Sequence, residues 1–396
     1  MDDSITLGLE GIKYYKAGKY SQAESLFHKS LEIKENANTL INLAVVYREL
    51  HKPKEAKNAL KRSIRIDPRN SVAYNNLANV YNSLGDKKKS MTCFIESLKL
   101  DPKNESAIKN LGMLYSNMSE FELALKTFKT SPKNNYLGRI AECLFHLGHY
   151  KEFWSAIEEY SEYERVDMKC AAISAYASNQ LDEKDLYNFC PNPLDFIYKT
   201  TANFFNPHIL DLYKNTKANL LRAKDLRRQE LIKNGEQTGG NYFDSEDLTS
   251  NNLQDFIDIQ VNDYYRFYKS FNNNFIKKWP KKYQLYGWGI TLTDSGNLSP
   301  HNHTTGWVSG SFYIQIPKNL EKNEASIFFS LYGDGYPVLN ENKIPTKILD
   351  VKTGDIVIFP SSLFHGTIPF KSNDKRICFA FDQRPEWYIN DFSAHY

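Results

Sequence analysis

The chain of 396 residues has little cysteine, little net charge and no long apolar run. Its five cysteines are scattered without a CxxC pair, which predicts free thiols in a reducing compartment. The net charge of +3 is close to balance, so neither a nucleic acid nor an anionic membrane is expected as a partner. No stretch reaches the roughly 18 apolar residues of a membrane span, and the first residues lack the basic and apolar regions of a signal peptide. We therefore expect a cytoplasmic protein.

Apolar and aromatic residues, in contrast, are plentiful. Hydrophobic residues make up 41% of the chain and charged residues 24%, a balance typical of soluble globular proteins. The 26 tyrosines and 24 phenylalanines are enough to fill large cores. At this length, two or three domains are expected.

The first part of the chain is organised around a tyrosine that recurs at Tyr14, Tyr47, Tyr81 and Tyr115, in steps of 33, 34 and 34 residues. Small and large apolar residues recur at matching offsets around it. The pattern resembles the tetratricopeptide repeat, a helix–turn–helix unit in which small residues let paired helices approach and large ones fill the space between them. It predicts an α-solenoid of four or five repeats over residues 1–165, enough to bury a continuous core.

An asparagine recurs with the same period, at Asn42, Asn76 and Asn110. In the repeat this position belongs to the inner helix, which faces the concave groove. An amide side chain both donates and accepts, so it can hold the backbone of an extended peptide whatever its side chains. The ladder resembles that of some tetratricopeptide enzymes and predicts a peptide-binding role. The alternative is that asparagine is common in this chain and is merely tolerated on the helices.

Residues 166–234 are expected to form a helical cap and linker, with helices over 194–205 and 207–233. The remainder, 235–396, is predicted to be a β-domain. Between Trp288 and Phe381 the apolar runs are five to eight residues long and are bounded by turn residues, which is typical of a sandwich or barrel of short strands. Residues 235–250 are interpreted as a lid or an entry strand, and 251–279 as a supporting helix.

Three histidines are placed to form a metal site within this β-region. His301 and His303 lie two residues apart at a strand end, so both rings point to one side, and His365 follows 62 residues later behind another strand. Three such ligands would close one face of an octahedron and leave the other open, as in non-haem Fe(II) oxygenases. Arg376 opens the last long strand, and its guanidinium can hold a carboxylate with two hydrogen bonds. The alternatives are structural histidines and a solvated arginine beside Lys375.

The segment His301-Asn-His303-Thr-Thr-Gly-Trp-Val-Ser309-Gly310-Ser-Phe-Tyr313 resembles the Fe(II)/2-oxoglutarate-dependent dioxygenases, in particular a bacterial and phage branch with the pattern His-x-His-(x)5-Ser-Gly-x-x-Tyr. Gly354-Asp355, Phe359-Pro360 and then His365 match as well. The resemblance spans roughly residues 235–382. It implies a double-stranded β-helix (jelly-roll) fold, with Fe(II) and 2-oxoglutarate as cofactors.

The resemblance also assigns roles. His301 and His365 would fill the two histidine places of the metal triad, and Arg376 would pair with the distal carboxylate of 2-oxoglutarate. From their place on the strands we also expect Tyr286 and Tyr313 to line the pocket and bind the cofactor; packing in the core is the alternative for each aromatic residue here. Trp288 and Trp307 are also candidates for the pocket wall, and Tyr332 and Tyr336 for its entrance.

His303 departs from the family pattern, because most relatives carry Asp or Glu there. Three neutral imidazoles leave the iron site one negative charge short. Either His303 binds the metal as a third imidazole, which we favour, or it lies behind the ligands and a water or another carboxylate takes its place. Asp294 and Asp355 are the nearest spare carboxylates in the sequence.

The sequence thus predicts a multidomain α + β protein: a dioxygenase that hydroxylates a protein or peptide presented by the groove of the repeats. Three alternatives remain open. The first is a three-histidine dioxygenase that does not use 2-oxoglutarate. The second is an interaction scaffold with an inactive β-domain. The third is a small-molecule hydroxylase whose repeats serve only assembly.

Overall fold

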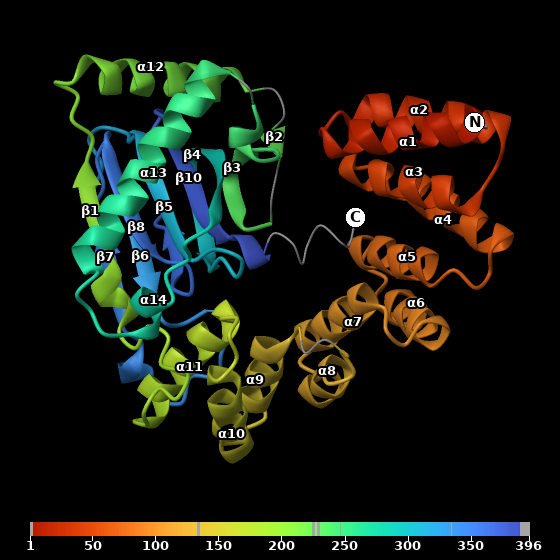
Figure 1. Ribbon diagram of the computed structural model, residues 1–396, viewed down its shortest axis with the longest axis horizontal. Coiled ribbons are helices and arrows are strands. Elements are labelled where there is room, and N and C mark those ends of the chain that lie inside the picture. The colour runs from red at the N-terminus through yellow and green to blue at the C-terminus, as the bar shows by residue number, and fades with distance from the viewer. Residues whose placement is uncertain are drawn as a thin grey trace. The chain divides into compact units, whose positions relative to one another are not determined.

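A computed structural model describes residues 3–132, 135–223, 226–227, 230–245, 247–333 and 335–388. The chain divides into two compact units, Met1–Leu147 and Gly148–Tyr396. Helical repeats are followed by a curled antiparallel sheet, so the predicted fold class is confirmed (Figure 1). The division falls earlier than residue 165, and the expected domain ranges stay predictions. None of the helices in the described ranges is long and apolar enough to cross a membrane.

The first unit consists of paired helices. They are α1 (Asp3–Lys16), α2 (Tyr20–Ile33), α3 (Ala37–Glu49), α4 (Pro53–Ile66), α5 (Ser71–Ser83), α6 (Lys87–Leu100), α7 (Glu105–Asn117), α8 (Phe121–Phe128) and α9 (Leu137–His146). Close approach in the α1–α2 and α7–α8 pairs depends on glycine. A Cβ at Gly11 would come within 2.7 Å of the Phe27 ring, and one at Gly112 within 2.4 Å of the Phe128 ring. The small and large repeat positions therefore interlock as the sequence predicts.

A second asparagine series, which the sequence analysis did not single out, starts three of these helices. Asn36, Asn70 and Asn104 are the N-caps of α3, α5 and α7. Each side-chain oxygen accepts from the backbone N–H three residues later, at 2.8, 3.2 and 3.1 Å respectively. Such caps satisfy N–H groups that the first helical turn leaves unpaired. The 34-residue period is thus seen in the N-caps of the helices as well as in their packing.

The second unit carries the remaining helices: α10 (Tyr150–Ser161), α11 (Met168–Leu181), η1 (Pro193–Phe196), α12 (Pro207–Arg222), η2 (Tyr242–Asp244), α13 (Leu248–Tyr268), α14 (Asn274–Lys277) and η3 (Glu341–Lys343). The helix expected over 207–233 ends at Arg222, and the one expected over 251–279 is interrupted after Tyr268. The prediction of a helix over 194–205 is wrong. Only one 3-10 turn forms there, and Tyr198–Thr201 is strand β1, because its backbone pairs with strand β8 (Asp355–Pro360).

The sheet order is β1-β8-β5-β10-β4-β9-β6-β7, and all of its pairings are antiparallel; β3 also pairs with β4, and β2 with β3. The strands are β1 (Tyr198–Thr201), β2 (Leu226–Arg227), β3 (Ile232–Thr238), β4 (Tyr283–His301), β5 (Val308–Gln315), β6 (Ile327–Ser330), β7 (Thr346–Leu349), β8 (Asp355–Pro360), β9 (Phe364–Thr367) and β10 (Arg376–Pro385). Strands β8 and β9 are buried along their whole length, so the core of the unit lies between the curled faces.

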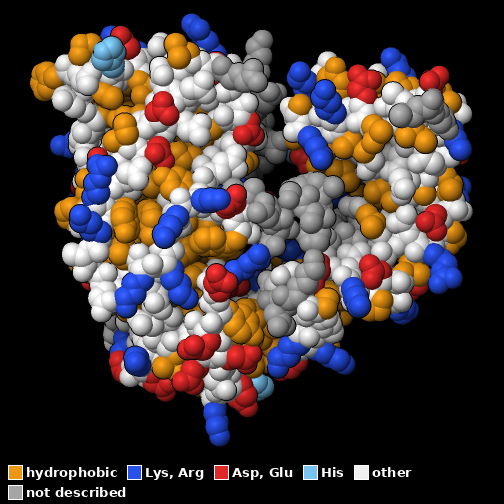
Figure 2. All heavy atoms as spheres, viewed as in Figure 1, with side chains coloured by type: hydrophobic (Ala, Val, Ile, Leu, Met, Phe, Trp, Pro, Cys, Tyr) orange, Lys and Arg blue, Asp and Glu red, His pale blue; other side chains and the backbone are white. Residues whose placement is uncertain are grey.

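Helix α13 crosses one face of this sheet (Figure 1). Its Phe256 packs on Phe312 of β5, with ring centroids 5.5 Å apart. Leu248 and Ile259, on the side of the helix away from the buried Ile257 and Val261, stay exposed. Figure 2 shows hydrophobic side chains among scattered charges of both signs on the face of this unit that α13 crosses. The helix therefore covers the sheet and seals it from outside, as expected of a supporting helix.

Candidate metal centre

The three predicted histidines meet at one point of the second unit. His301 ends β4 and lies opposite His365 of β9 in the strand register. His303 follows in the loop after β4, where its N–H donates to the Ser361 carbonyl at 3.0 Å. The ring centroids are 4.4 to 5.2 Å apart, and one ligand nitrogen from each ring lies within 4.8 Å of the others. Residues 62 positions apart in the chain thus converge as the spacing predicts.

Each ring also turns its Nδ1 towards an oxygen. Nδ1 of His301 lies 2.8 Å from the Ser299 carbonyl, that of His365 3.3 Å from the Leu363 carbonyl, and that of His303 2.5 Å from a carboxylate oxygen of Asp382. Metal-binding histidines characteristically donate the second ring N–H to a carbonyl or carboxylate in this way, which fixes the tautomer. Nε2 is then the nitrogen that would bind an ion, and the set fits a divalent metal.

Burial keeps one of these imidazoles neutral. His365 is buried in the protein, and this lowers its pKa well below the ordinary value of about 6.5, with His301 and His303 adding to the effect. A neutral imidazole offers a lone pair at neutral pH. The site is therefore ready for a cation without first losing a proton from His365.

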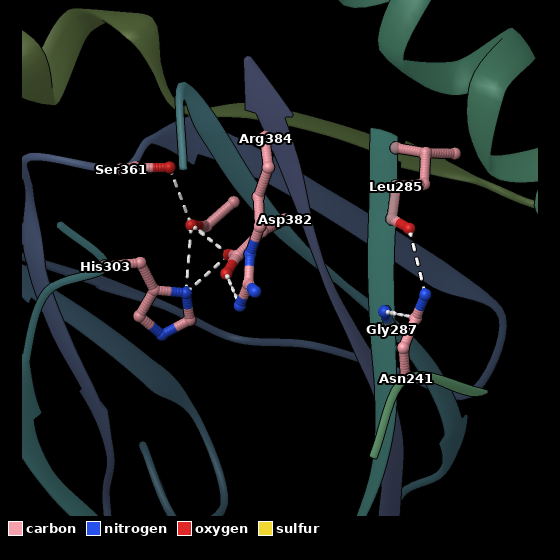
Figure 3. A network of polar contacts seen from close by, with 8 residues as sticks. Asn241, Leu285, Gly287, His303, Ser361, Asp382 and Arg384 are labelled. Carbon is pink, nitrogen blue, oxygen red and sulfur yellow. Dashed lines mark hydrogen bonds and ion pairs between the residues drawn. The ribbon is translucent and has the colours of Figure 1, made fainter. Parts of the chain in front are cut away.

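The carboxylate at this centre is Asp382, which the sequence analysis missed. Its Oδ1 also accepts from the Ser309 hydroxyl at 2.7 Å, and its Oδ2 pairs with Arg384 at 3.3 Å (Figure 3). Burial alone would raise its pKa, but His303, Arg384 and Ser309 together hold the pKa of Asp382 below its ordinary value. The alternation of side chains along β10 could have identified it, since Asp382 lies six residues beyond Arg376 and hence on the same face.

The two carboxylates proposed as spare ligands lie elsewhere. Asp355 accepts from the Thr201 hydroxyl at 2.7 Å and pairs with Lys199 at the β1–β8 edge. Asp294 accepts from the backbone N–H of Ser372 at 3.0 Å. Neither residue lines the cavity at the histidines, so neither supports the alternative in which another carboxylate takes the place of His303.

A cavity of about 420 Å³ opens beside the histidines, and Arg376 and Tyr313 lie in its wall. Arg376 is only 2% exposed and donates from Nε to the Ala325 carbonyl at 3.0 Å. Its guanidinium lies 5.1 Å from the centre of the Tyr313 ring. The buried Tyr313 hydroxyl has no partner at hydrogen-bond geometry among the described residues, and burial raises its pKa although Arg376 opposes this. A fixed cation beside an unsatisfied hydroxyl fits a carboxylate ligand.

The other wall candidates divide into two groups. Tyr286 and Trp288 line the cavity, and Tyr286 carries the Arg384 guanidinium 3.7 Å from its ring centre. Trp307 is instead fully buried, and its indole N–H donates to the Phe275 carbonyl. The predicted entrance is also wrong: Tyr336 is buried and packs edge-on against Phe364, with ring centroids 5.6 Å apart. Tyr332 packs on Tyr176 of α11, and neither tyrosine borders the cavity.

Where β3 ends, side chains instead of backbone carbonyls accept hydrogen bonds from the N–H groups of β4. The N–H of Gly289 donates to Thr238 Oγ1 at 3.0 Å, and that of Gly287 donates to Asn241 Oδ1 at 2.8 Å (Figure 3). Between these contacts Gly239 and Gly240 line the cavity, and Gly240 has φ +68, which residues with a side chain rarely adopt. Of the two interpretations of residues 235–250, the entry strand therefore describes the start of the segment, where β3 ends. A glycine turn follows it.

The predicted asparagine ladder lies on α3, α5 and α7 of the first unit, and all three side chains are half-buried. Asn110 donates from Nδ2 to Asn75 of the preceding repeat at 3.0 Å, and Asn76 donates to the Val72 carbonyl of its own helix at 3.1 Å. One amide N–H of Asn76 and one of Asn110 therefore already have a partner within the array. Their peptide-binding role stays a prediction.

Comparison with known proteins agrees with both halves of the chain. Residues 287–382 match the family described as "Putative 2OG-Fe(II) oxygenase", and residues 14–80 and 71–104 match tetratricopeptide-repeat families. The chain therefore carries tetratricopeptide repeats followed by a segment that matches this putative oxygenase family. The matched oxygenase segment begins at β4 and ends at Asp382, so it contains the whole histidine cluster.

Solved structures similar to the chain include tetratricopeptide proteins. The first such domain of human RPAP3 is 22% identical, with a TM-score of 0.29, and covers 30% of this chain and 94% of that chain. A thermophilic repeat protein from Thermus thermophilus is 18% identical, with a TM-score of 0.34, and covers 39% and 89%. No curated protein matches the chain.

Proposed function

We propose that the second unit is an Fe(II)- and 2-oxoglutarate-dependent dioxygenase that hydroxylates its substrate. His301, His303 and His365 would hold the iron, and Arg376 the distal carboxylate of 2-oxoglutarate. The observation that carries this proposal is the convergence of three imidazoles, each with Nδ1 turned to an oxygen, on a cavity that also contains a buried arginine.

Iron and 2-oxoglutarate, when bound, supply the oxidising power that breaks a substrate C–H bond. The protein supplies position and charge. The three histidines would hold the ion at one end of the cavity and leave one side of it open. Arg376 would neutralise the far carboxylate of the co-substrate, and the Tyr313 hydroxyl would donate the hydrogen bond for which it now lacks a partner. Tyr286 and Trp288 would exclude water from the reacting atoms.

We further propose that the substrate is a protein or peptide held by the repeats. Solenoid repeats present extended concave binding surfaces, which supports this choice. Asn42, Asn76 and Asn110 recur on the helices expected to line that surface. Each amide has two N–H donors and a carbonyl acceptor, so the single internal contact of Asn76 or Asn110 leaves capacity for a peptide backbone. The five free thiols support a reducing, cytoplasmic setting, in which Fe(II) stays reduced.

The decisive test is release of succinate from 2-oxoglutarate by the purified full chain on addition of Fe(II) and dioxygen. We expect succinate from the native chain and none from the His301→Ala or His365→Ala variants. Asp355→Asn is the matched control, because it alters a buried charged residue of the same unit outside the cavity. Metal binding without succinate would favour the three-histidine dioxygenase, and absence of metal binding would favour the scaffold.

The role of the repeats needs its own test. Asn42, Asn76 and Asn110 are replaced together by alanine, and hydroxylation of the cellular substrate is compared with uncoupled succinate release in its absence. We expect the first to fall and the second to persist, because the ladder lies outside the catalytic unit. Unchanged hydroxylation would favour the small-molecule hydroxylase.

A further inference from the structure

The charge balance at the histidines raises a question that the proposed iron site leaves open. Three neutral imidazoles bring no negative charge to a divalent cation, whereas a ligating carboxylate brings one. Within the described part of the chain, the carboxylate in hydrogen-bond contact with the cluster is that of Asp382, behind His303. It is 2% exposed, so neither water nor salt screens it effectively.

Every contact of this carboxylate comes from a donor. His303 Nδ1 lies 2.5 Å from Oδ1 and the Ser309 hydroxyl 2.7 Å from it, while Arg384 reaches Oδ2 at 3.3 Å (Figure 3). Because Ser309 gives its only proton to Asp382, it must accept from the Ser361 hydroxyl, which lies 2.8 Å away. A carboxyl group surrounded only by donors is ionised.

The same contacts fix the proton of His303. A charged Asp382 can only accept, so the imidazole carries a hydrogen on Nδ1, and Nε2 is left as the nitrogen that can bind a metal. Ser309 Oγ lies 3.1 Å from the same nitrogen, so the hydroxyl that donates to Asp382 also borders the imidazole. The carboxylate therefore both orients the ring and lets its negative charge act on the metal-facing side of the imidazole.

We propose that Asp382 supplies, through the ring of His303, the negative charge that a ligating carboxylate would give the metal directly. Asp382 is thus a positioning residue, and the pair of Asp382 and His303 takes the place of one acidic ligand. This inference rests on the proposed metal site. It concerns the strength of metal binding, and not the reaction that follows.

The test measures affinity for Co(II), an air-stable substitute for Fe(II), by competition with a chelator. Asp382→Asn keeps the shape and removes the charge, and we expect it to weaken binding about 10- to 100-fold. His303→Glu places a carboxylate where it can bind the metal directly, beside the carboxylate of Asp382. In that background Asp382→Asn removes the repulsion between the two carboxylates, so we expect it to leave affinity unchanged or to improve it.

This reversal separates the proposal from a purely structural role, which would make Asp382→Asn harmful in both backgrounds. Equal affinity of the native chain and Asp382→Asn would overturn it. So would native affinity in His303→Ala, because Asp382 would then be the ligand itself. Failure of the native chain to bind Co(II) would instead overturn the proposed function and this inference together.

A second variant covers the case in which Asp382→Asn does not fold. Arg384→Gln removes the cation that competes for the carboxylate and leaves its contacts with His303 and Ser309 in place. We expect Co(II) affinity to stay the same or to rise. A loss of 10-fold or more would show that the network acts through packing alone and would overturn the charge proposal.

Discussion

Replacement of Arg376 by methionine should reduce the affinity for 2-oxoglutarate while leaving metal binding intact. Methionine keeps an unbranched stem and loses every donor. The side chain is 2% exposed, and its Nε donates to the Ala325 carbonyl. Its Nη1 lies 3.5 Å from Cys378 Sγ, a weak acceptor, and this contact leaves each terminal nitrogen with at least one N–H to donate. The two terminal nitrogens therefore remain to form a two-bonded contact with a carboxylate.

The size of the effect follows from these two bonds. Hydrogen bonds to charged groups contribute about 1.5–3 kcal/mol each, so losing two costs about 3–6 kcal/mol. Since about 1.4 kcal/mol is tenfold in a binding constant, the dissociation constant should rise about 10²- to 10⁴-fold. Lysine at this position keeps the charge without the planar fork and should give an intermediate loss.

The assay is titration calorimetry of the Fe(II)-loaded protein with 2-oxoglutarate under anaerobic conditions. Lys375→Met is the control, because it removes the adjacent but exposed charge. Thermal unfolding of the metal-free variants would show whether the Ala325 contact is needed for the fold. Native affinity in a folded Arg376→Met variant would refute the assignment of this arginine to the co-substrate.

Two further predictions concern stability. Folding lowers the pKa of His365, so below about pH 6.5 the unfolded chain binds a proton that the folded chain does not. The metal-free second unit should therefore lose stability as the pH falls below that value, by at most about 1.4 kcal/mol per pH unit. Tryptophan fluorescence would follow this in urea, since all five tryptophans lie beyond residue 148, and His365→Asn should remove its share of the slope. In the repeats, Gly112→Ala should destabilise by about 1–3 kcal/mol against the Phe128 ring, whereas Gly8→Ala, with ordinary contacts, should stabilise by up to about 1 kcal/mol. Loss of helical circular dichroism in denaturant would measure the free energy of unfolding of both variants. Equal changes in the two variants would contradict the packing argument.

Periodic features of the fold could be predicted from the sequence because each is carried by local pattern. The 34-residue period predicted where the helices lie, because the same pattern of small and large residues recurs in each repeat. The histidine cluster was also accessible, because His-x-His at a strand end fixes two rings and a distant histidine behind a strand completes the set. Here the prediction depends on spacing alone, and the register of β4 and β9 places His301 opposite His365.

The errors lie where pairing between distant segments overrides local preference. Residues 198–201 form an edge strand because β8 offers them an unpaired backbone edge, and no local pattern reveals that edge. Residues 232 and 233 were expected to end a helix over 207–233, but they begin strand β3 and pair with β4 instead. The spare carboxylate was sought near the histidines in sequence, whereas Asp382 lies 79 residues beyond His303.

Strand β10 shows why the missing carboxylate depends on register. Arg376 and Asp382 are six residues apart and face the same cavity, about 20 Å apart along the strand at roughly 3.3 Å per residue. A slip of one residue would turn both outward and place Ile377 and Phe379 in the cavity. Pairing with β4 on one side and β5 on the other opposes that slip, because it would have to break the hydrogen bonds to both neighbouring strands. The same strand thus positions the anchor proposed for the co-substrate and the charge proposed for the metal, so a substitution that shifts its register should impair both functions at once.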